Sequence, residues 1–389
     1  MPSDDLATTI FLIFTGAAVL ATVALFLRQS LLIAYIALGL LIGPSGLGLV
    51  EDPEDIRRIA GFGVMFLLFL LGLNMYPQKL VQLARETTLV TGASSLVFAL
   101  LGWGAGRALG YTQAESLVLG AALTFSSTIL GLKLLPTTVL HHRRTGEVII
   151  SILLLQDLVA IAILVWIEWA SATGLSPVQL VLHLAALPGA IAFALLFARY
   201  ALIPLIARFD AIQEYVFLVA LGWCLGLAEL AHFLGLSHEV GAFIAGVALA
   251  TSRIADFIAD HLRPLRDFFL VLFFFSLGAG FDLRMLHSVW LPAIGLTVLV
   301  LVLKPPVFRG LLRLSGEASG RATEVGLRLG QISEFSLFIA LAAERAGIID
   351  TRMSYLIQTA TLLSFVVSGS LIVTRCPTPI ALSEQLRRD

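Results

Sequence analysis

The sequence predicts an all-α polytopic membrane protein with about 13 transmembrane helices and an inverted structural repeat. Three observations predict this fold class. The 389 residues are 58% hydrophobic and only 13% charged, whereas about a quarter of the residues of a soluble domain are charged. Apolar runs long enough to cross a bilayer recur along the whole chain. Two of these runs, separated by other spans, are interrupted by polar residues at mid-depth.

A bilayer core of about 30 Å needs roughly 20 helical residues, and this length defines the expected spans. The first run follows acidic rather than basic residues, so we expect it to be retained as a helix and not cleaved as a signal peptide. The expected spans are residues 6–27, 31–50, 58–75, 87–109, 115–135, 147–170, 178–206, 212–232, 238–251, 265–281, 288–313, 323–344 and 353–375.

Lys and Arg residues are distributed unevenly between the two sets of connecting segments. Fifteen of the 25 lie on the face that holds the C-terminus, six on the other, and four within or near spans. Because positively charged connections stay in the cytoplasm, we expect a plasma (inner) membrane protein with the N-terminus outside and the C-terminus inside. The expected domains are a transmembrane domain, 1–376, and a short cytoplasmic tail, 377–389, with no nucleotide-binding domain after it.

The composition argues against several other function classes. The net charge is −1 and the charges are confined to short segments, so no basic surface for nucleic acid is expected. The two cysteines, Cys224 and Cys376, suggest neither a disulfide framework nor a metal cluster. We find no P-loop, zinc-binding His-Glu-x-x-His or nucleophile elbow, so we expect neither an enzyme nor a cofactor.

Asp157, with Gln156 beside it, is surrounded by apolar residues in the sixth expected span. It lies about 15 Å from either end of that span, near the bilayer midplane. A charge at this depth costs about 2.5–3.5 kcal/mol, so we expect the side chain to face a cavity or a partner rather than lipid. We interpret Asp157 as a binding carboxylate; the alternative is a structural ion pair or a protonated carboxyl in a helix contact.

Polar residues interrupt the fifth and the twelfth expected spans. Either interruption alone is a weak signal, because Ser and Thr in membrane helices commonly bond to their own backbone. One span is odd-numbered and the other even-numbered, so they cross the membrane in opposite directions, as in an inverted repeat with a midplane site between two broken helices. The residues are Thr124, Ser126, Ser127 and Thr128 in the first, and Gln331, Ser333, Glu334 and Ser336 in the second.

Lys304 is a further charge within an expected span, and two prolines follow it directly. The helix ladder is loosened at such a pair. Lys304 is expected either to pair with Asp157 or Glu334, or to extend towards the cytoplasmic face with Arg309.

Five segments resemble the membrane domain of Kef-type members of the monovalent cation:proton antiporter-2 family. They are "LTFSSTILGLKLL", "LLLQDLVAI", "HEVGAFIAGVALA", "LRPLRDFFLVLFFFSLGAGFDL" and "GQISEFSLF", and the similarity covers essentially the whole chain. The resemblance implies the sodium/proton-antiporter fold, in which a core domain with two crossed broken helices moves against a dimerisation domain, and it implies a homodimer. Kef-type proteins usually continue into a cytosolic nucleotide-binding domain, which this sequence does not include.

The resemblance also assigns roles to residues. Asp157 would bind the cation and the proton alternately, with Gln156 beside it and oxygens from Thr124, Ser126, Ser127 and Thr128 nearby. Glu334, Gln331, Ser333 and Lys304 would support the second helix break.

A carboxylate in a partly dehydrated site favours its neutral form, whereas an entering cation stabilises its ionised form. The proton and a monovalent cation would therefore compete for Asp157, and this competition would couple their gradients by alternating access. With Gln156 in place of a second acid, we expect electroneutral exchange, with K⁺ favoured over Na⁺. The alternatives are a Na⁺/H⁺ antiporter of the same fold or a cation channel that Asp157 lines.

Overall fold

The structure is a computed structural model, and it describes residues 6–27, 29–50, 54–73, 77–133, 144–171, 177–234, 236–252 and 254–378. Most of the expected cytoplasmic tail, residues 379–389, lies outside this range. So do several of the basic residues that underlie the predicted orientation, namely Arg28, Arg143, Arg253, Arg387 and Arg388.

The secondary-structure elements of the described residues are helices, and each of the thirteen expected spans is occupied by one helix or by a broken series of helices. Seven of the described helices are long and apolar enough to cross a membrane. The elements are α1 (Leu6–Phe26), α2 (Leu31–Ile42), α3 (Glu54–Leu73), α4 (Pro77–Ala108), α5 (Gln113–Thr124), α6 (Thr128–Lys133), α8 (Arg144–Ser171), α9 (Pro177–Phe197), η1 (Ala198–Leu202), α10 (Ile203–Arg208), α11 (Gln213–Phe233), α12 (His238–Leu249), α13 (Ile254–His261), α14 (Arg263–Ala279), α15 (Leu283–Leu314), α16 (Ser319–Arg328), α17 (Glu334–Arg345) and α18 (Thr351–Arg375).

Several boundaries differ from the expected spans, and α4, for example, begins at Pro77 rather than at residue 87. The second span was expected to reach residue 50, but α2 ends at Ile42. Pro44 follows, and the chain turns there with the N–H groups of Gly46 and Gly48 bonded to the Gly43 carbonyl. Gly48 has a φ of 63°, a conformation that glycine adopts readily. The short helix α13 was not expected at all, because its polar residues read as a connection.

Side-chain caps explain where several helices begin. Thr112 and Glu115 form a reciprocal capping box at the start of α5. The Asp350 carboxylate accepts a 2.7 Å hydrogen bond from the Met353 N–H at the start of α18. Ser237 caps α12 in the same way. These caps satisfy N–H groups that a helix terminus leaves unpaired.

The described chain forms two compact units, in keeping with the expected two-domain architecture. Unit 1 comprises Met1–Ala17, Tyr35–Leu80 and Glu168–Phe281, and unit 2 comprises Ala18–Ala34, Val81–Ile167 and Asp282–Asp389. In unit 1, α3 packs against α12 and α14, and α12 packs against α11 and α9.

Glycines allow the helices of unit 1 to pack backbone against backbone. A Cβ added to Gly246 of α12 would collide with the Phe69 carbonyl of α3 and lie 2.9 Å from the Gly72 Cα. Gly39 of α2 contacts α14 in the same close manner. Small residues drive helix association in membranes because they permit such close packing.

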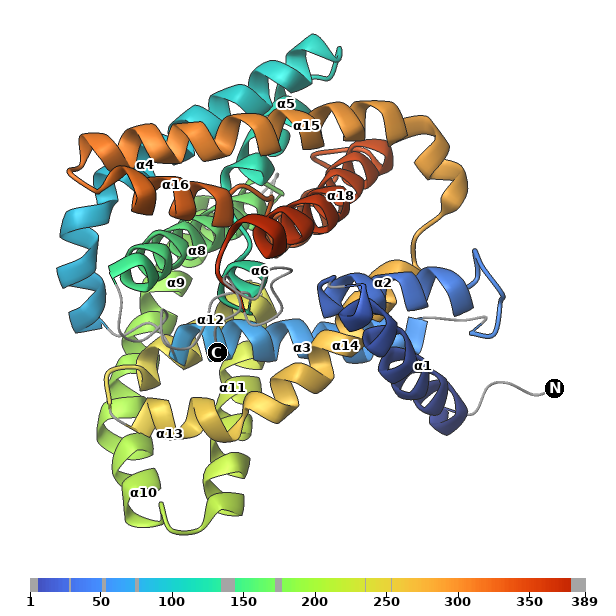
Figure 1. Ribbon diagram of the computed structural model, residues 1–389. Helices are drawn as coiled ribbons and strands as arrows, with labels where there is room; N and C mark the ends of the chain where they lie inside the picture. Colours follow the sequence, from blue (N-terminus) through green and yellow to red (C-terminus); the bar gives the residue numbers. More distant parts are fainter. Residues whose placement is uncertain are drawn as a thin grey trace. The chain divides into compact units, whose positions relative to one another are not determined.

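Unit 2 contains the same sequence of elements twice. A long helix, a broken helix and a second long helix occur first as α4, α5/α6 and α8, and again as α15, α16/α17 and α18. In Figure 1 the first set runs from blue to green and the second from orange to red. Helix α17 of the second set packs against α5 of the first. This arrangement confirms the predicted repeat with two broken helices.

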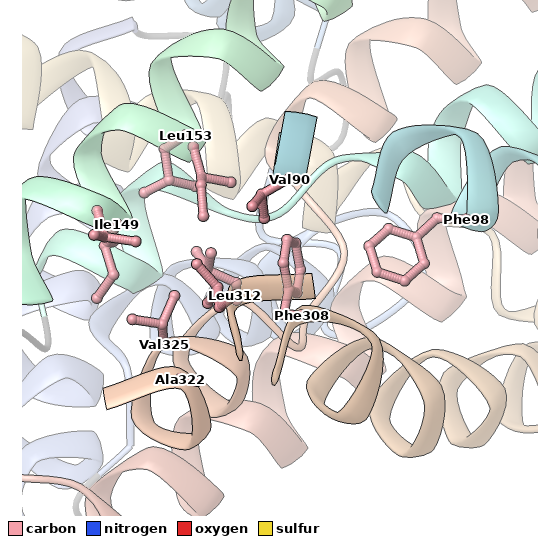
Figure 2. Close-up of a cluster of buried hydrophobic side chains, with 11 residues drawn as sticks. Val90, Phe98, Ile149, Leu153, Phe308, Leu312, Ala322 and Val325 are labelled. Atoms are coloured by element: carbon pink, nitrogen blue, oxygen red, sulfur yellow. The ribbon is translucent and has the colours of Figure 1, made fainter. Parts of the chain in front are cut away.

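A hydrophobic cluster joins α4, α8, α15 and α16 within unit 2 (Figure 2). Phe98 of α4 and Phe308 of α15 meet edge to face in it, with ring centroids 5.3 Å apart. Ile149 and Leu153, about two turns and one turn before Asp157 on α8, are also part of the cluster and are buried. The cluster therefore holds α8 against the second repeat, close to the helix breaks.

We predict that Gly246→Ala destabilises the protein by about 1–3 kcal/mol, the usual effect of forcing an extra carbon into a packed contact. The matched control is Gly226→Ala on α11, where an added Cβ meets nothing within 4 Å and alanine favours the helix. Thermal unfolding of the purified variants in detergent measures both. Equal melting temperatures for the two variants would contradict the close α3–α12 contact.

Candidate functional site

The two helix breaks of unit 2 are stabilised by the polar residues that interrupt the apolar sequence. Helix α5 ends at Thr124, Phe125 is extended with ψ 152°, and α6 begins at Thr128. The Ser127 hydroxyl accepts a 3.0 Å bond from the Leu130 N–H, and the Ser333 hydroxyl accepts one of 3.1 Å from the Phe335 N–H. Each half-helix thus begins at a serine cap.

Hydrogen bonds join the two breaks directly. The Ser126 hydroxyl donates to the Leu329 carbonyl at 2.8 Å, and the Ser336 hydroxyl donates to the Ala122 carbonyl. All four residues lie within or beside the breaks, and both serines are fully buried. The interrupted segments therefore cross each other, as the inverted repeat predicts.

Lys304 of α15 binds both breaks. Its ammonium donates to the Phe125 carbonyl at 2.6 Å and to the Gln331 carbonyl at 3.1 Å, and it lies 5.1 Å from the centre of the Phe98 ring. These carbonyls follow the C-terminal ends of α5 and α16, where the helix dipoles place partial negative charge. The ring adds a cation–π contact.

This geometry corrects the expected roles of Lys304. Its side chain is only 1% exposed, so it does not extend to the membrane surface. Among the described residues, its hydrogen bonds go to the two backbone carbonyls rather than to the carboxylates of Asp157 or Glu334. The helix breaks leave carbonyl groups without intrahelical partners, and a buried ammonium satisfies two of them at once.

Asp157 lies at the centre of α8 and is 1% exposed. The Thr128 hydroxyl, at the first residue of α6, is 3.3 Å from both carboxylate oxygens. Glu334, at the first residue of α17, is also buried and interacts electrostatically with Asp157. Two carboxyl groups therefore share a buried region beside the N-terminal ends of two half-helices, where the dipoles favour negative charge.

Gln156 supports the first break from the preceding position on α8. Its Oε1 accepts a 3.0 Å bond from the Ser126 N–H, and its Nε2 lies 3.4 Å from the Thr124 carbonyl. The Thr124 hydroxyl bonds within its own helix, to the Gly120 carbonyl at 2.9 Å. Gln156 and Thr124 thus brace the backbone around the break.

The structure brings every predicted site residue into unit 2 around the crossing. Among these residues, Thr128 is the one with a described hydrogen bond to Asp157. The backbone around the two breaks is held instead by hydrogen bonds of Ser126, Ser127, Gln156, Gln331 and Ser333. Sequence reasoning missed Ser364 and Ser368 of α18, which bond to the second break. Two serines one helical turn apart in an apolar run can indicate a polar contact with another segment. Serines that bond only to the backbone of their own helix have the same sequence pattern, so the sequence does not distinguish the two cases.

The fold and this crossing define a polytopic membrane protein with two crossed broken helices, an architecture that is typical of secondary transporters. The chain belongs to the sodium/hydrogen exchanger family, whose transmembrane domain matches residues 10–375. Kef-type potassium-efflux proteins are among its similar relatives.

Three comparisons illustrate the similarity. The chain is 32% identical to the glutathione-regulated potassium-efflux system protein KefC of an Enterobacter species, over 93% of this chain and 59% of the relative. It is 29% identical to the iron transporter MagA of Paramagnetospirillum magneticum, over 88% of this chain and 79% of the relative. The sodium proton antiporter MjNhaP1 of Methanocaldococcus jannaschii shares the fold, with a TM-score of 0.72 at 17% identity over 94% of this chain and 95% of that one. The chain thus spans less than two thirds of the length of its KefC relative.

We predict that Lys304→Met destabilises the protein by about 1–3 kcal/mol for each buried carbonyl left without a donor. The matched control is Arg309→Gln on the same helix, where the side chain is exposed and we expect almost no change. Thermal unfolding in detergent, with size-exclusion chromatography as a check on folding, measures the difference. A Lys304→Met variant as stable as Arg309→Gln would show that the ammonium is dispensable to the crossing.

Proposed function

We propose that this protein is a secondary active antiporter that exchanges a monovalent cation for H⁺ by competition at Asp157. The observation that carries the proposal is a buried carboxylate at the centre of a membrane helix, held by a hydroxyl. None of the ion pairs described in the structure includes Asp157. A buried carboxylate of this kind needs either a proton or a cation to offset its charge.

Competition at one carboxylate would couple the two ions. When Asp157 is protonated it has no charge to attract a cation, and a bound cation stabilises the ionised form and releases the proton. If the core domain moves only with Asp157 neutralised, each transit carries one ion or the other. The gradient of one would then drive the other without ATP.

The buried charges support one-for-one exchange. The crossing contains two carboxyl groups, Asp157 and Glu334, and the ammonium of Lys304. The buried guanidinium of Arg328, at the end of α16, is paired with Glu324. If Glu334 and Lys304 keep their charges, they balance each other, and ionised Asp157 requires one positive charge. One monovalent cation or one proton satisfies this requirement, and the exchange is electroneutral.

K⁺ is our first choice of cation. It is supported by the Kef-type relatives and by the neutral Gln156 beside Asp157, since a second acid at that position would give a stronger field. Na⁺ is the alternative, supported by the sodium/hydrogen exchanger family. The name of the MagA relative, an iron transporter, adds iron as a third cation to test. A channel lined by the same residues is the remaining alternative, and it would not couple cation movement to protons.

We propose a plasma membrane location with the N-terminus outside and the C-terminus in the cytoplasm, supported by the excess of Lys and Arg on the C-terminal face. A homodimer, in which unit 1 forms the contact between copies, is supported by the family resemblance. Unit 2, which holds both breaks, would be the moving core.

We predict that Asp157→Asn abolishes cation-dependent proton movement in proteoliposomes, because the amide neither ionises nor exchanges a proton. The matched control is Glu147→Gln, which removes an exposed carboxylate from the same helix and should leave exchange within about twofold. A pH-sensitive dye follows proton movement after addition of K⁺, Na⁺, Li⁺, Rb⁺ or Fe²⁺. Exchange that persists in Asp157→Asn would remove Asp157 from the mechanism.

We also predict that the exchange rate does not respond to membrane potential, since no net charge moves in a one-for-one cycle. Proteoliposomes with the potential clamped at zero or at about 100 mV, which is worth about 2.3 kcal/mol per charge moved, make the comparison. The ion that sets the potential must be chosen so that it is not itself transported. A rate that changes several-fold with potential would contradict electroneutral exchange.

A further inference from the structure

Gln331 contacts both helix breaks with different parts of the residue. Its backbone carbonyl accepts the hydrogen bond from the Lys304 ammonium. Its side-chain Nε2 lies 3.4 Å from the Ser127 carbonyl of the first break, and its Oε1 accepts a 3.0 Å bond from the Ser368 hydroxyl of α18. The side chain is fully buried.

The neighbouring groups determine which way the Gln331 amide points. The Ser127 carbonyl can only accept a hydrogen bond, so it must face the NH₂ group. The carboxamide oxygen then faces Ser368, whose hydroxyl can donate. The Ser127 carbonyl therefore selects the orientation of the amide, and Ser368 stabilises this orientation by its hydrogen bond to the amide oxygen.

α18 holds the second break at a further point. The Ser364 hydroxyl, one helical turn before Ser368, accepts a 3.0 Å bond from the Ile332 N–H. Ser364 and Ser368 are both buried, at 0% and 2% exposure. A continuous helix thus anchors the main chain of the break through Ser364 and the Gln331 side chain through Ser368.

The first break leads directly to the candidate ion site. Ser127, whose carbonyl faces Gln331, precedes Thr128, whose hydroxyl contacts both oxygens of Asp157. The peptide bond that joins these residues is planar, so the direction of the Ser127 carbonyl also sets the position of the Thr128 N–H and Cα. A shift of Gln331 would therefore move the hydroxyl that contacts Asp157.

We propose that Gln331, stabilised by Ser368, is a positioning residue that sets the size of the cation site and thereby its cation selectivity. This inference rests on the proposed exchange function. Selectivity between ions of equal charge depends on the spacing and rigidity of the ligands, and a site with one anchor removed relaxes to fit other ions.

The test uses the purified 389-residue chain and three variants at these positions. Ser368→Ala removes the hydroxyl that bonds to the amide oxygen, and Ser368→Thr keeps a hydroxyl there. Gln331→Met removes both hydrogen bonds of the side chain, while methionine has a side chain of similar length. The matched control is Thr361→Val on α18, which removes a buried hydroxyl that bonds within its own helix, to the Ile357 carbonyl. Size-exclusion chromatography selects the variants that fold.

Two readouts are measured for K⁺, Na⁺, Li⁺ and Rb⁺. The first is the cation concentration that half-maximally raises the melting temperature, which reports binding without transport. The second is the apparent KM and maximal rate of cation-dependent proton movement in proteoliposomes.

We expect Ser368→Ala and Gln331→Met to change the ratio of K⁺ to Na⁺ affinity by about tenfold, equivalent to about 1.4 kcal/mol. Ser368→Thr and Thr361→Val should keep the wild-type ratio. An unchanged ratio in both Ser368→Ala and Gln331→Met, or an equal loss of rate for every cation, would overturn the positioning role. Cation binding without proton exchange in wild type would overturn the proposed function alone, and wild type that binds no cation would overturn both.

Discussion

The structure of unit 2 depends on how two broken helices are stabilised where their polar groups are buried inside the protein. Each break leaves carbonyl and N–H groups without helical partners, and unpaired groups cost several kcal/mol each in a membrane. The Lys304 ammonium bonds to one carbonyl from each break, so a single side chain both satisfies these groups and joins the repeats. The Phe98 ring and the hydrophobic cluster behind it hold Lys304 in place.

The crossing separates charges by helix polarity. The ammonium of Lys304 lies at the C-terminal ends of α5 and α16, and the carboxyl groups of Asp157 and Glu334 lie beside the N-terminal ends of α6 and α17. Helix dipoles favour both placements. Backbone carbonyls bind Lys304, and no described ion pair joins Lys304 to Asp157. A carboxylate that is to bind transported ions must be free of such a permanent partner. Gln156 and Gln331 bond to the backbone of the first break through their neutral amide groups.

Much of this architecture could be predicted from the sequence, because the membrane imposes simple rules on length and polarity. The spans, the two interruptions and the central position of Asp157 in its helix follow from apolar runs and their exceptions. The partners of Lys304 could not be predicted, since they are backbone carbonyls that carry no sequence signal. Ser368 could not be separated from serines that bond to their own helix. The end of α2 was missed because the apolar run continues past Pro44.

In the proposed mechanism a proton and a cation exclude each other at Asp157. The most direct measurement is proton release from purified protein in weakly buffered detergent solution when the preferred cation is added at saturating concentration. At a pH where Asp157 is protonated, the account predicts release of about one proton per chain, and none from Asp157→Asn. Cation binding that releases no proton from wild type, or the same amount from Asp157→Asn, would contradict it.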